Sequence, residues 1–252
     1  MGQARSSISA TIITKNEAAN IAACIESLSW ADEIVVVDSG STDETVAIAK
    51  RYTEKVFVET WQGQGRQKNR AAELASGPWI LSVDADERVS SELAREIRQA
   101  VASGDAAVYA MRRKNLYKGQ WVRHCGWWPD WVKRLFRKGE ARFSDDVIHD
   151  SLHSERPVRK LAAPLEHHSF HSPEDFLMRA YWYAHHQARE LHRKGRRASV
   201  WTAVSHGAFA LLQTYFLRLG FLDGAAGLLV AVSNGVGVFY RYMMLRDLGR
   251  GT

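Results

Sequence analysis

The sequence has only two cysteines in 252 residues and no recognisable export signal. Cys24 and Cys125 form no C-x-x-C pair and imply no disulfide framework, so a reducing cytosol is the expected compartment. Residues 1–17 lack the basic start and long apolar run of a secretory signal. Both absences predict a protein that stays in the cytosol.

A convincing membrane-spanning segment is also missing. Residues 200–219 are apolar but contain His206 and Arg218, and residues 224–240 are only 17 uncharged residues, four of them glycine, where a span needs about 20 apolar residues. Trp, Tyr and Arg near the ends of these stretches are typical of helices in the membrane interface. We therefore predict that residues 171–252 form helices that associate with a membrane surface. The alternative is a helical hairpin that packs on the domain or on another subunit.

Acidic residues are scarce in one part of the chain. The net charge is +6 overall, but residues 112–142 hold ten Lys or Arg against only Asp130 and Glu140. Four tryptophans lie in the same segment. Basic residues interleaved with aromatic ones suit a sugar–phosphate, a lipid headgroup or a nucleic acid, so we expect this segment to contact an anionic partner.

Strand-like and helix-like segments alternate through the first 112 residues. This alternation predicts right-handed βαβ units and a parallel sheet, in which ligands bind at the carboxyl ends of the strands. The expected strands are residues 8–14, 33–38, 55–59, 79–83, 106–112, 131–137 and 158–161. The expected helices are residues 17–30 (with Asn16 as N-cap), a helix that ends at Lys50 (with Thr42 or Asp43 as N-cap), and residues 64–75, 92–101 and 176–194.

Three carboxylates follow the buried run at residues 79–83, and they are Asp84, Asp86 and Glu87. Ionised carboxylates beside a core need a compensating charge. Mg²⁺ or Mn²⁺ prefers such oxygens and leaves positions open for phosphate, so the spacing favours a divalent-cation site. The alternative is a polar turn with helix-capping acids.

Several motifs give these residues a known context. Within residues 8–112 they read T-I-I-T-K-N-E-A-A-N-I, V-V-V-D-S-G-S-T-D-E-T, G-Q-G-R-Q-K-N-R-A and W-I-L-S-V-D-A-D-E, and later W-W-P-D-W-V-K-R-L-F-R, V-I-H-D-S-L and G-F-L-D-G. By the first four motifs the chain resembles family 2 glycosyltransferases of the GT-A fold. By the later three it resembles the bacterial lipopolysaccharide inner-core β-1,4-glucosyltransferases. The resemblance implies an α/β domain with a Rossmann-like, mostly parallel sheet over residues 1–170, followed by the helical region 171–252.

The resemblance also implies a nucleotide-sugar donor at the strand edge. Asp38 would contact its uracil or ribose, although a turn aspartate is the alternative. Asp86 would hold Mg²⁺ or Mn²⁺ across the two phosphates, and Asp84 would contact the ribose, the metal or a water on the metal. His149 would ligate the metal or contact the diphosphate, and His168 is a second candidate. The remaining residues expected to bind the donor are Thr14, Asn16, Glu17, Arg66, Lys68 and Arg134.

An inverting transfer needs a carboxylate that removes a proton from the acceptor hydroxyl. Members of the family place this base in an acidic pair, which here reads His149-Asp150. The resemblance thus implies Asp150 as base, with Asp146 and then Asp145 as the next candidates. The acceptor site would be shaped by Trp127, Trp128, Asp130, Arg134 and Arg137; the alternative is that the tryptophans are core and the arginines a solvated rim.

The resemblance therefore implies an inverting, metal-dependent transferase that moves a hexose, with UDP-glucose as donor, to a lipid-linked saccharide such as the lipopolysaccharide inner core. It would act at the cytoplasmic face of the bacterial inner membrane, without nucleic acid, and a homo-oligomer is compatible with the sequence. The alternatives are transfer to polyprenyl phosphate or a peptide, a non-catalytic sugar-nucleotide-binding assembly protein, and a nucleic-acid-binding protein.

Overall fold

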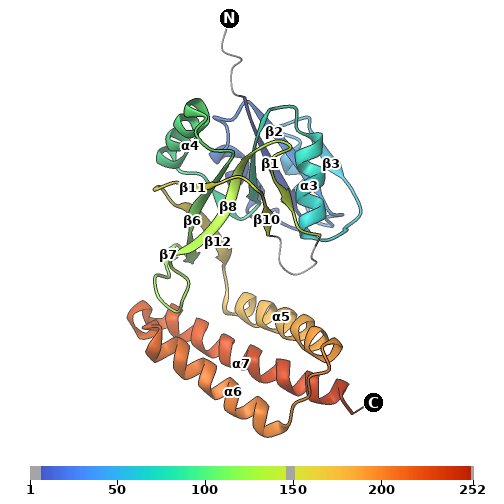
Figure 1. Ribbon diagram of the computed structural model, residues 1–252, viewed down its shortest axis with the longest axis vertical. Helices are drawn as coiled ribbons and strands as arrows, with labels where there is room; N and C mark the ends of the chain where they lie inside the picture. The colour runs from blue at the N-terminus through green and yellow to red at the C-terminus, as the bar shows by residue number, and fades with distance from the viewer. Residues whose placement is uncertain (1–6, 146–150, 251–252) are drawn as a thin grey trace, which may run out of the picture. The chain divides into compact units, whose positions relative to one another are not determined.

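Two compact units make up the computed structural model, which describes residues 7–145 and 151–250 (Figure 1). The first unit comprises Met1–Arg113 and Asp130–His167, and the second comprises Lys114–Pro129 and His168–Thr252. The segment Lys114–Pro129 thus groups with the C-terminal helices. The division at residue 170 that the sequence suggested stays a prediction.

The sheet of the first unit begins with parallel strands, as the alternation predicted. Strand β1 pairs in parallel with β2 and β4, and β2 pairs in parallel with β3. Beyond β4 the order β3-β2-β1-β4-β8-β6-β12-β5 continues with antiparallel pairs, β4 with β8 and β8 with β6. The α/β fold class is therefore confirmed. The strands of this sheet path are β1 (Ile8–Thr14), β2 (Glu33–Asp38), β3 (Val56–Val58), β4 (Trp79–Asp84), β5 (Glu87–Arg88), β6 (Val108–Tyr117), β8 (Asp130–Arg137) and β12 (Leu165–Phe170).

Shorter strands lie outside that path. Strand β11 (Val158–Lys160) pairs in parallel with β6, β7 (Gln120–Trp121) pairs with the end of β6, and β9 (Arg142–Phe143) pairs with β10 (Leu152–His153). The sequence analysis missed β5, β7, β9, β10 and β12. Most of these have two or three residues, too few to show a period.

The helices of the first unit are α1 (Ile21–Ser27), α2 (Thr45–Ala49), α3 (Gln64–Leu74) and α4 (Ser91–Ser103). Ser90 caps α4 by accepting a hydrogen bond from the Leu93 amide, and Gly104 ends the helix with φ +63°. The prediction that Asn16 caps the first helix is wrong, because α1 begins at Ile21 rather than at Glu17, and Asn16 has φ +55°.

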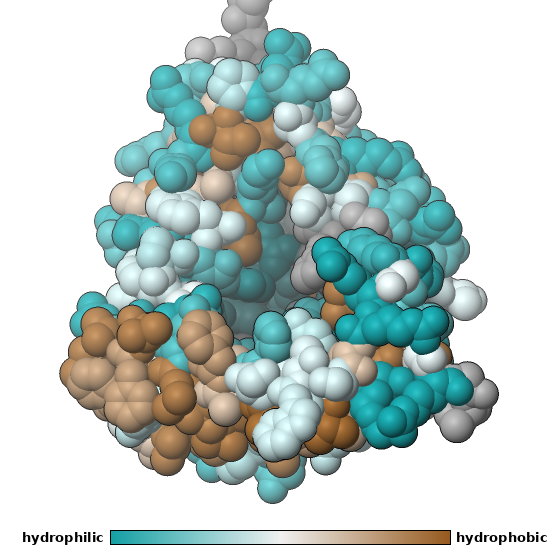
Figure 2. Space-filling view, turned by 60° about the horizontal axis from the view of Figure 1, so that its bottom comes forward, coloured by the Kyte–Doolittle hydropathy of each residue, from teal (hydrophilic) through white to brown (hydrophobic). Residues whose placement is uncertain are grey.

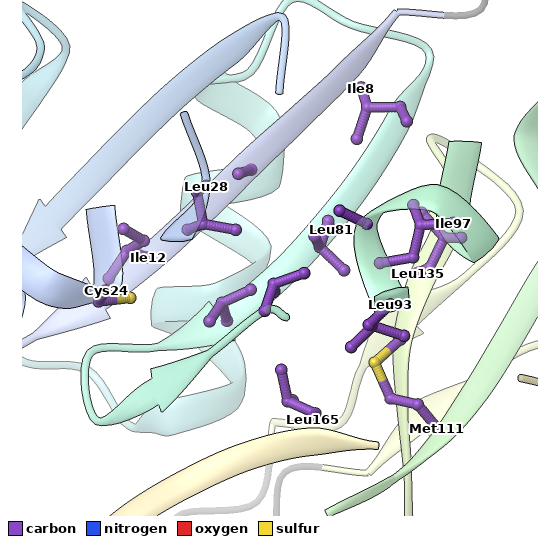
Figure 3. Close-up of a cluster of buried hydrophobic side chains, with 14 of the residues drawn as sticks. Ile8, Ile12, Cys24, Leu28, Leu81, Leu93, Ile97, Met111, Leu135 and Leu165 are labelled. Carbon is purple, nitrogen blue, oxygen red and sulfur yellow. The ribbon is translucent and has the colours of Figure 1, made fainter. Parts of the chain in front are cut away.

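One core of the first unit lies between the sheet and helices α1 and α4, and a second cluster joins the sheet to Ala71 of α3. Ile12 and Leu81 on the sheet meet Leu28 near α1 and Leu93 and Ile97 on α4, all buried (Figure 3). Each such side chain contributes about 1.5–3 kcal/mol by leaving water. Every residue of β1 but one is buried, which fits a central strand covered on both faces.

The second unit is built on α5 (Pro173–Arg193), α6 (Val200–Leu212) and α7 (Gly224–Leu248). Helix α6 continues into a π-helical turn, Gln213–Leu217, and a 3₁₀ turn, Gly220–Asp223, precedes α7. Helix α7 packs against both α5 and α6. Asp223 is buried and its carboxylate accepts from the amides of Arg123 and His124, at 3.2 and 2.7 Å, so this aspartate fastens the segment 114–129 to the helices.

Glycines allow α6 and α7 to approach closely. A Cβ added to Gly235 would lie 2.9 Å from the Leu211 Cβ, and one added to Gly207 would lie 3.0 Å from the Gly235 carbonyl oxygen. By length and composition alone, Gly220–Leu248 is the helical stretch in the described residues that would suffice to cross a membrane, and 39% of its apolar window is buried inside the protein. Buried core helices of soluble proteins meet the same criteria.

Glu33 joins three segments at the amino end of β2. Its carboxylate accepts hydrogen bonds from the Ser9 hydroxyl and the Lys55 ammonium, and from the amide and hydroxyl of Ser76 at 2.8 and 2.9 Å. Burial alone would raise the pKa of Glu33, but these donors outweigh it and lower the pKa to about 2. The ionised form is thus the one that stabilises the fold.

We predict that Glu33→Gln lowers the free energy of unfolding by about 1–3 kcal/mol at neutral pH, because charge-assisted hydrogen bonds are lost. The wild-type pKa is depressed in the fold, so this contribution is present above about pH 4.5 and disappears as the pH falls towards 2. Urea unfolding at pH 7 and pH 3 measures both effects. Glu54→Gln, an exposed neighbour, is the control; equal effects of the two substitutions at pH 7 would contradict the prediction.

Candidate active site

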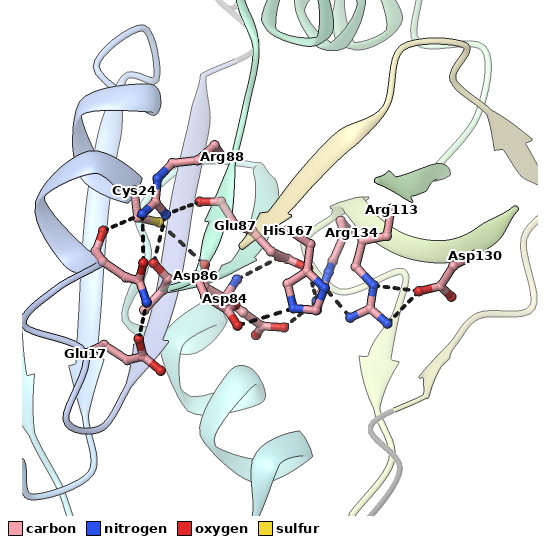
Figure 4. A network of polar contacts seen from close by, with 12 residues as sticks. Glu17, Cys24, Asp84, Asp86, Glu87, Arg88, Arg113, Asp130, Arg134 and His167 are labelled. Carbon is pink, nitrogen blue, oxygen red and sulfur yellow. Dashed lines mark hydrogen bonds and ion pairs between the residues drawn. The ribbon is translucent and has the colours of Figure 1, made fainter. Parts of the chain in front are cut away.

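The acidic cluster forms a tight turn between β4 and β5 (Figure 4). The Asp84 amide donates a 2.9 Å hydrogen bond to Oε2 of Glu87, which closes the turn. Glu87 is fully buried, and its Oε1 accepts from Nη2 of Arg134 at 2.7 Å. The suggestion that Glu87 caps the following helix is wrong, because Ser90 performs that role.

Asp84 is held between two cations. Its Oδ1 lies 2.9 Å from Nζ of Lys68, and its Oδ2 pairs with Arg134. Burial alone would raise the pKa of Asp84, but the charges of Arg134 and Lys68 outweigh it and keep the pKa far below its usual range. Asp84 therefore stays ionised and already has compensating charge, which favours a role in fixing the turn and contacting a neutral ribose over a role in binding a metal.

Lys68 reaches Asp84 because the amino end of α3 lies very close to β9. A Cβ added to Gly65 would lie 1.7 Å from the Ser144 carbonyl oxygen, so only glycine fits there. The Asn69 side chain exchanges hydrogen bonds of 2.9 Å with the Phe143 backbone. Lys68 is 1% exposed, so it does not belong to a solvated face of α3. Arg66, by contrast, is exposed and lies 3.7 Å from Asp145.

Asp86 has a different partner. Its Oδ2 lies 3.3 Å from Nε2 of His167 on β12, the residue that pairs with Glu87 of β5 (Figure 4). Both side chains are mostly buried but reach the surface. The histidines predicted for the metal or the diphosphate were His149 and, as a second candidate, His168; both stay predictions, and His167 was not foreseen. Because side chains alternate along a strand, Leu165 and His167 share one side of β12 and His168 points to the other, so recognising this strand would have selected His167.

The donor set at Asp86 suits a hard divalent cation. Among the residues that the structure describes, no group of three or more His, Cys, Asp or Glu gathers to form a complete metal site. Mg²⁺ and Mn²⁺ sites in nucleotide enzymes commonly use one or two protein ligands and take the rest from phosphates and water. Asp86 supplies a carboxylate, and the imidazole of His167 adds a nitrogen that Mn²⁺ accepts more readily than Mg²⁺, so the residues present fit a divalent metal, and Mn²⁺ best.

Hydrogen bonds join the loop that follows β1 to the loop that follows β2. Asp38 is fully buried, and its carboxylate accepts from the amides of Gly40 and Ser41 at 2.9 and 2.8 Å. Asn16 accepts from the Thr42 amide at 2.8 Å, and the Glu17 amide donates to the Thr45 hydroxyl at 2.8 Å. These contacts give Asp38 the turn-forming role that was the alternative interpretation. The prediction that it also contacts the nucleotide stays untested, as do those for Asn16 and Glu17.

Thr14 ends β1 next to these loops. Its hydroxyl is buried and, within the described part of the chain, has no hydrogen-bond partner. A buried hydroxyl without a partner costs free energy, so a ligand that supplies one would be favoured at this strand end.

The residues expected at the acceptor site are divided between the two units. Trp127 and Trp128 belong to the second unit, where Trp127 stacks on Phe170 with centroids 5.3 Å apart. Asp130, Arg134 and Arg137 belong to the first unit, and Arg137 lies over the Trp79 ring. The core interpretation thus fits Trp127. The predicted residues Asp146, His149 and Asp150 lie outside the described residues.

The comparisons with known proteins identify the family. The family model described as Glycosyl transferase family 2 matches residues 9–163, and the chain belongs to this family. The protein is therefore a glycosyltransferase, which confirms the resemblance seen in its motifs.

Relatives match over almost the whole chain. An uncharacterised glycosyltransferase of Rickettsia felis is 35% identical over 95% of this chain and 89% of its own length. The lipopolysaccharide core biosynthesis glycosyltransferase LpsC of Rhizobium meliloti is 29% identical over 92% of this chain and 89% of its own. Among solved structures, S. aureus TarS 1–349 in complex with UDP has a TM-score of 0.50 and 17% identity over 97% of this chain and 91% of that one; this likeness shows the fold.

If Asp86 and His167 hold the metal, His167→Asn is expected to weaken Mn²⁺-supported UDP binding by about 10–100-fold, because one of the two protein ligands is lost. Calorimetric titration of UDP with and without Mn²⁺ measures the change. His168→Asn is the matched control, one residue away on the opposite side of β12. Equal affinities of the two variants would remove His167 from the metal site.

Proposed function

We propose that the protein transfers a hexose, with UDP-glucose as donor, to a lipid-linked saccharide such as the lipopolysaccharide core, with inversion at the anomeric carbon. The observation that carries the proposal is the Asp86–His167 pair beside the charge-compensated Asp84, at the carboxyl ends of parallel strands in a family 2 chain. Ligands of such sheets bind at that edge. The name of LpsC supports the class of acceptor.

Each residue of the edge has a proposed task. Asp86 and His167 would hold Mg²⁺ or Mn²⁺, which when bound offsets the negative charge that builds up on the departing nucleoside diphosphate. Lys68 and Arg134 keep Asp84 ionised and fixed, so that it accepts a hydrogen bond from the ribose. Thr14 and the locked loops after β1 and β2 border the nucleoside. Arg66, exposed at the start of α3, is placed where an anion is favoured.

The acceptor hydroxyl needs a base, and we assign this role to Asp150. A positioned carboxylate removes the hydroxyl proton as the oxygen attacks the anomeric carbon. Asp146 is the second candidate, since it lies in the same acidic segment.

Asp150→Asn is expected to bind UDP and Mn²⁺ normally and to transfer sugar about 10²–10⁴-fold more slowly, the usual worth of a positioned base. Single-turnover transfer from radiolabelled UDP-glucose to total lipid extract, with the product identified by mass spectrometry, measures this. Asp146→Asn is the matched control; if it shows the large loss instead, the base is Asp146. A screen of UDP-galactose, UDP-N-acetylglucosamine and GDP-mannose tests the donor, and full transfer in a chelator would exclude the metal role.

The second unit supports association with a membrane surface. Apolar side chains stay exposed where α6 leads into α7, among them Phe216, Leu217 and Leu222, at 54, 72 and 57%. In Figure 2 hydrophobic side chains gather at one end of the helical unit and hydrophilic ones at the other. An exposed apolar patch of this kind marks an interaction surface. We propose a peripheral protein at the cytoplasmic face of a bacterial inner membrane.

The variant Phe216→Glu/Leu217→Glu/Leu222→Glu should no longer float with liposomes of bacterial lipid in a flotation assay. Each exposed apolar side chain that enters the interface adds roughly tenfold to binding, and the variant loses three of them. Val58→Glu, at an equally exposed apolar residue of the first unit, is the control and should still float. If the wild-type protein does not float and the triple variant instead changes the oligomeric state in sedimentation, the patch is a subunit interface.

A further inference from the structure

The second unit encloses a cavity that the donor site does not use. Its volume is about 410 Å³, within the usual range of small-molecule sites. Its walls come from α5, α7, the π-helical turn and the segment around Cys125. All of its lining residues belong to the second unit, so the cavity is defined without reference to the first.

Three arginines line this cavity, and no acidic residue does. They are Arg179 of α5, Arg218 after the π-helical turn and Arg241 of α7. In the described part of the chain none of the three forms a salt bridge with a carboxylate, whereas most arginines of the first unit's site do. Three like charges around one cavity repel one another unless an anion joins them.

Neutral groups hold these arginines in place. Arg241 donates a 2.8 Å hydrogen bond to Oε1 of Gln187, and its guanidinium lies 4.8 Å from the centre of the Tyr242 ring. Its Nε is buried and has no hydrogen-bond partner among the described residues. Arg179 lies over the Phe170 ring at 4.6 Å. The cations are thus positioned but not neutralised.

Arg218 depends on a glycine. Gly126 has φ +79°, and a Cβ added there would lie 2.9 Å from Nη1 and 3.1 Å from Cδ of Arg218. The backbone of the two segments is joined as well, because the Cys125 amide donates to the Arg218 carbonyl at 2.9 Å. The place of Arg218 at the cavity is therefore built into the turn.

One wall of the cavity is aromatic. Phe170 and Phe176 stack with centroids 4.0 Å apart, and Trp127 stacks on Phe170. The cavity is also far larger than a bare phosphate ion requires. A ligand that matches both the arginines and the aromatic wall has a phosphate at one end and an apolar surface at the other.

We propose that this cavity binds the phosphate-bearing head of an amphiphile, with Arg179, Arg218 and Arg241 around the phosphate and the aromatic wall against its apolar part. Arginine forks suit phosphate oxygens because they donate in pairs from a fixed plane. The exposed apolar side chains of the same unit, such as Phe216, are compatible with a ligand drawn from a lipid phase. The proposal does not depend on the donor or the transfer reaction.

The test uses the full-length protein and dihexanoyl phosphatidic acid below its micelle concentration, followed by calorimetry. We expect binding by the wild type, and about tenfold or greater weakening by Arg179→Gln and by Arg241→Gln, since each removes charge-assisted hydrogen bonds. Arg193→Gln is the matched control, because Arg193 is an exposed arginine of α5 outside the cavity. Arg241→Lys keeps the charge without the fork and should fall between wild type and Arg241→Gln.

Two further arms separate the sources of binding. Inorganic phosphate should bind more weakly than the lipid, and dihexanoyl phosphatidylcholine, which carries no net charge, should not compete. Binding that Arg193→Gln weakens as much as Arg179→Gln would be general surface attraction and would overturn the proposal, as would inorganic phosphate binding as tightly as the lipid. UDP binding with Mn²⁺ should stay at the wild-type value in every variant, which shows that the first unit is folded, and an unchanged thermal unfolding curve shows the same for the second.

Discussion

The catalytic edge depends on one ion-pair arrangement, Asp84 between Lys68 and Arg134. All three side chains are largely shielded from water. An unpaired charge is very costly in such a buried environment. Removing either cation would leave Asp84 with one counter-charge instead of two, and removing Asp84 would leave Lys68 without this partner while Arg134 keeps only Glu87. The pairing joins β4, α3 and β8, so it fixes the geometry of the turn that carries Asp86. Asp86, the proposed metal ligand, is thus positioned by ion pairs that do not include it.

A chain of charges extends this arrangement away from the turn. Arg134 also binds the buried Glu87, which lies 3.9 Å from Arg113, and Arg113 pairs with Asp130 at 2.7 Å. Two of the ten basic residues in 112–142, Arg113 and Arg134, are therefore neutralised within the protein, whereas six of the others are exposed. A local charge count overstates how much positive charge this segment offers to a partner. The arginines of the second unit's cavity differ in this respect, because none of them pairs with a carboxylate of the residues that the structure describes.

The sequence predicted the parallel half of the sheet well, because buried strands such as β2 and β4 are short, largely apolar segments that end in an aspartate. It also placed Asp84 and Asp86 together at the strand edge. It failed where long-range pairing decides the outcome. Strand β12 has a polar sequence, Leu-Glu-His-His-Ser-Phe, whose strand state comes from its neighbours, so His167, which faces Asp86, was not foreseen. Asn16 resembles a helix cap, yet its φ of +55° and its bond to Thr42 make it part of a loop lock.

The second unit is assembled from two pieces of chain that are far apart in sequence. Val122 and Cys125 pack with Phe170, Phe176, Ala226 and Val230, and Asp223 holds the amide of His124. During synthesis the ribosome releases the first piece about a hundred residues before the helix that covers it, so these apolar groups must wait in solvent for their partners. The C-terminal helices therefore cannot be removed without disturbing the segment around Val122 and Cys125. A shortened chain that ends before α7 would expose apolar residues that α7 normally covers. A loss of activity on truncation could therefore result from misfolding as well as from loss of a membrane anchor.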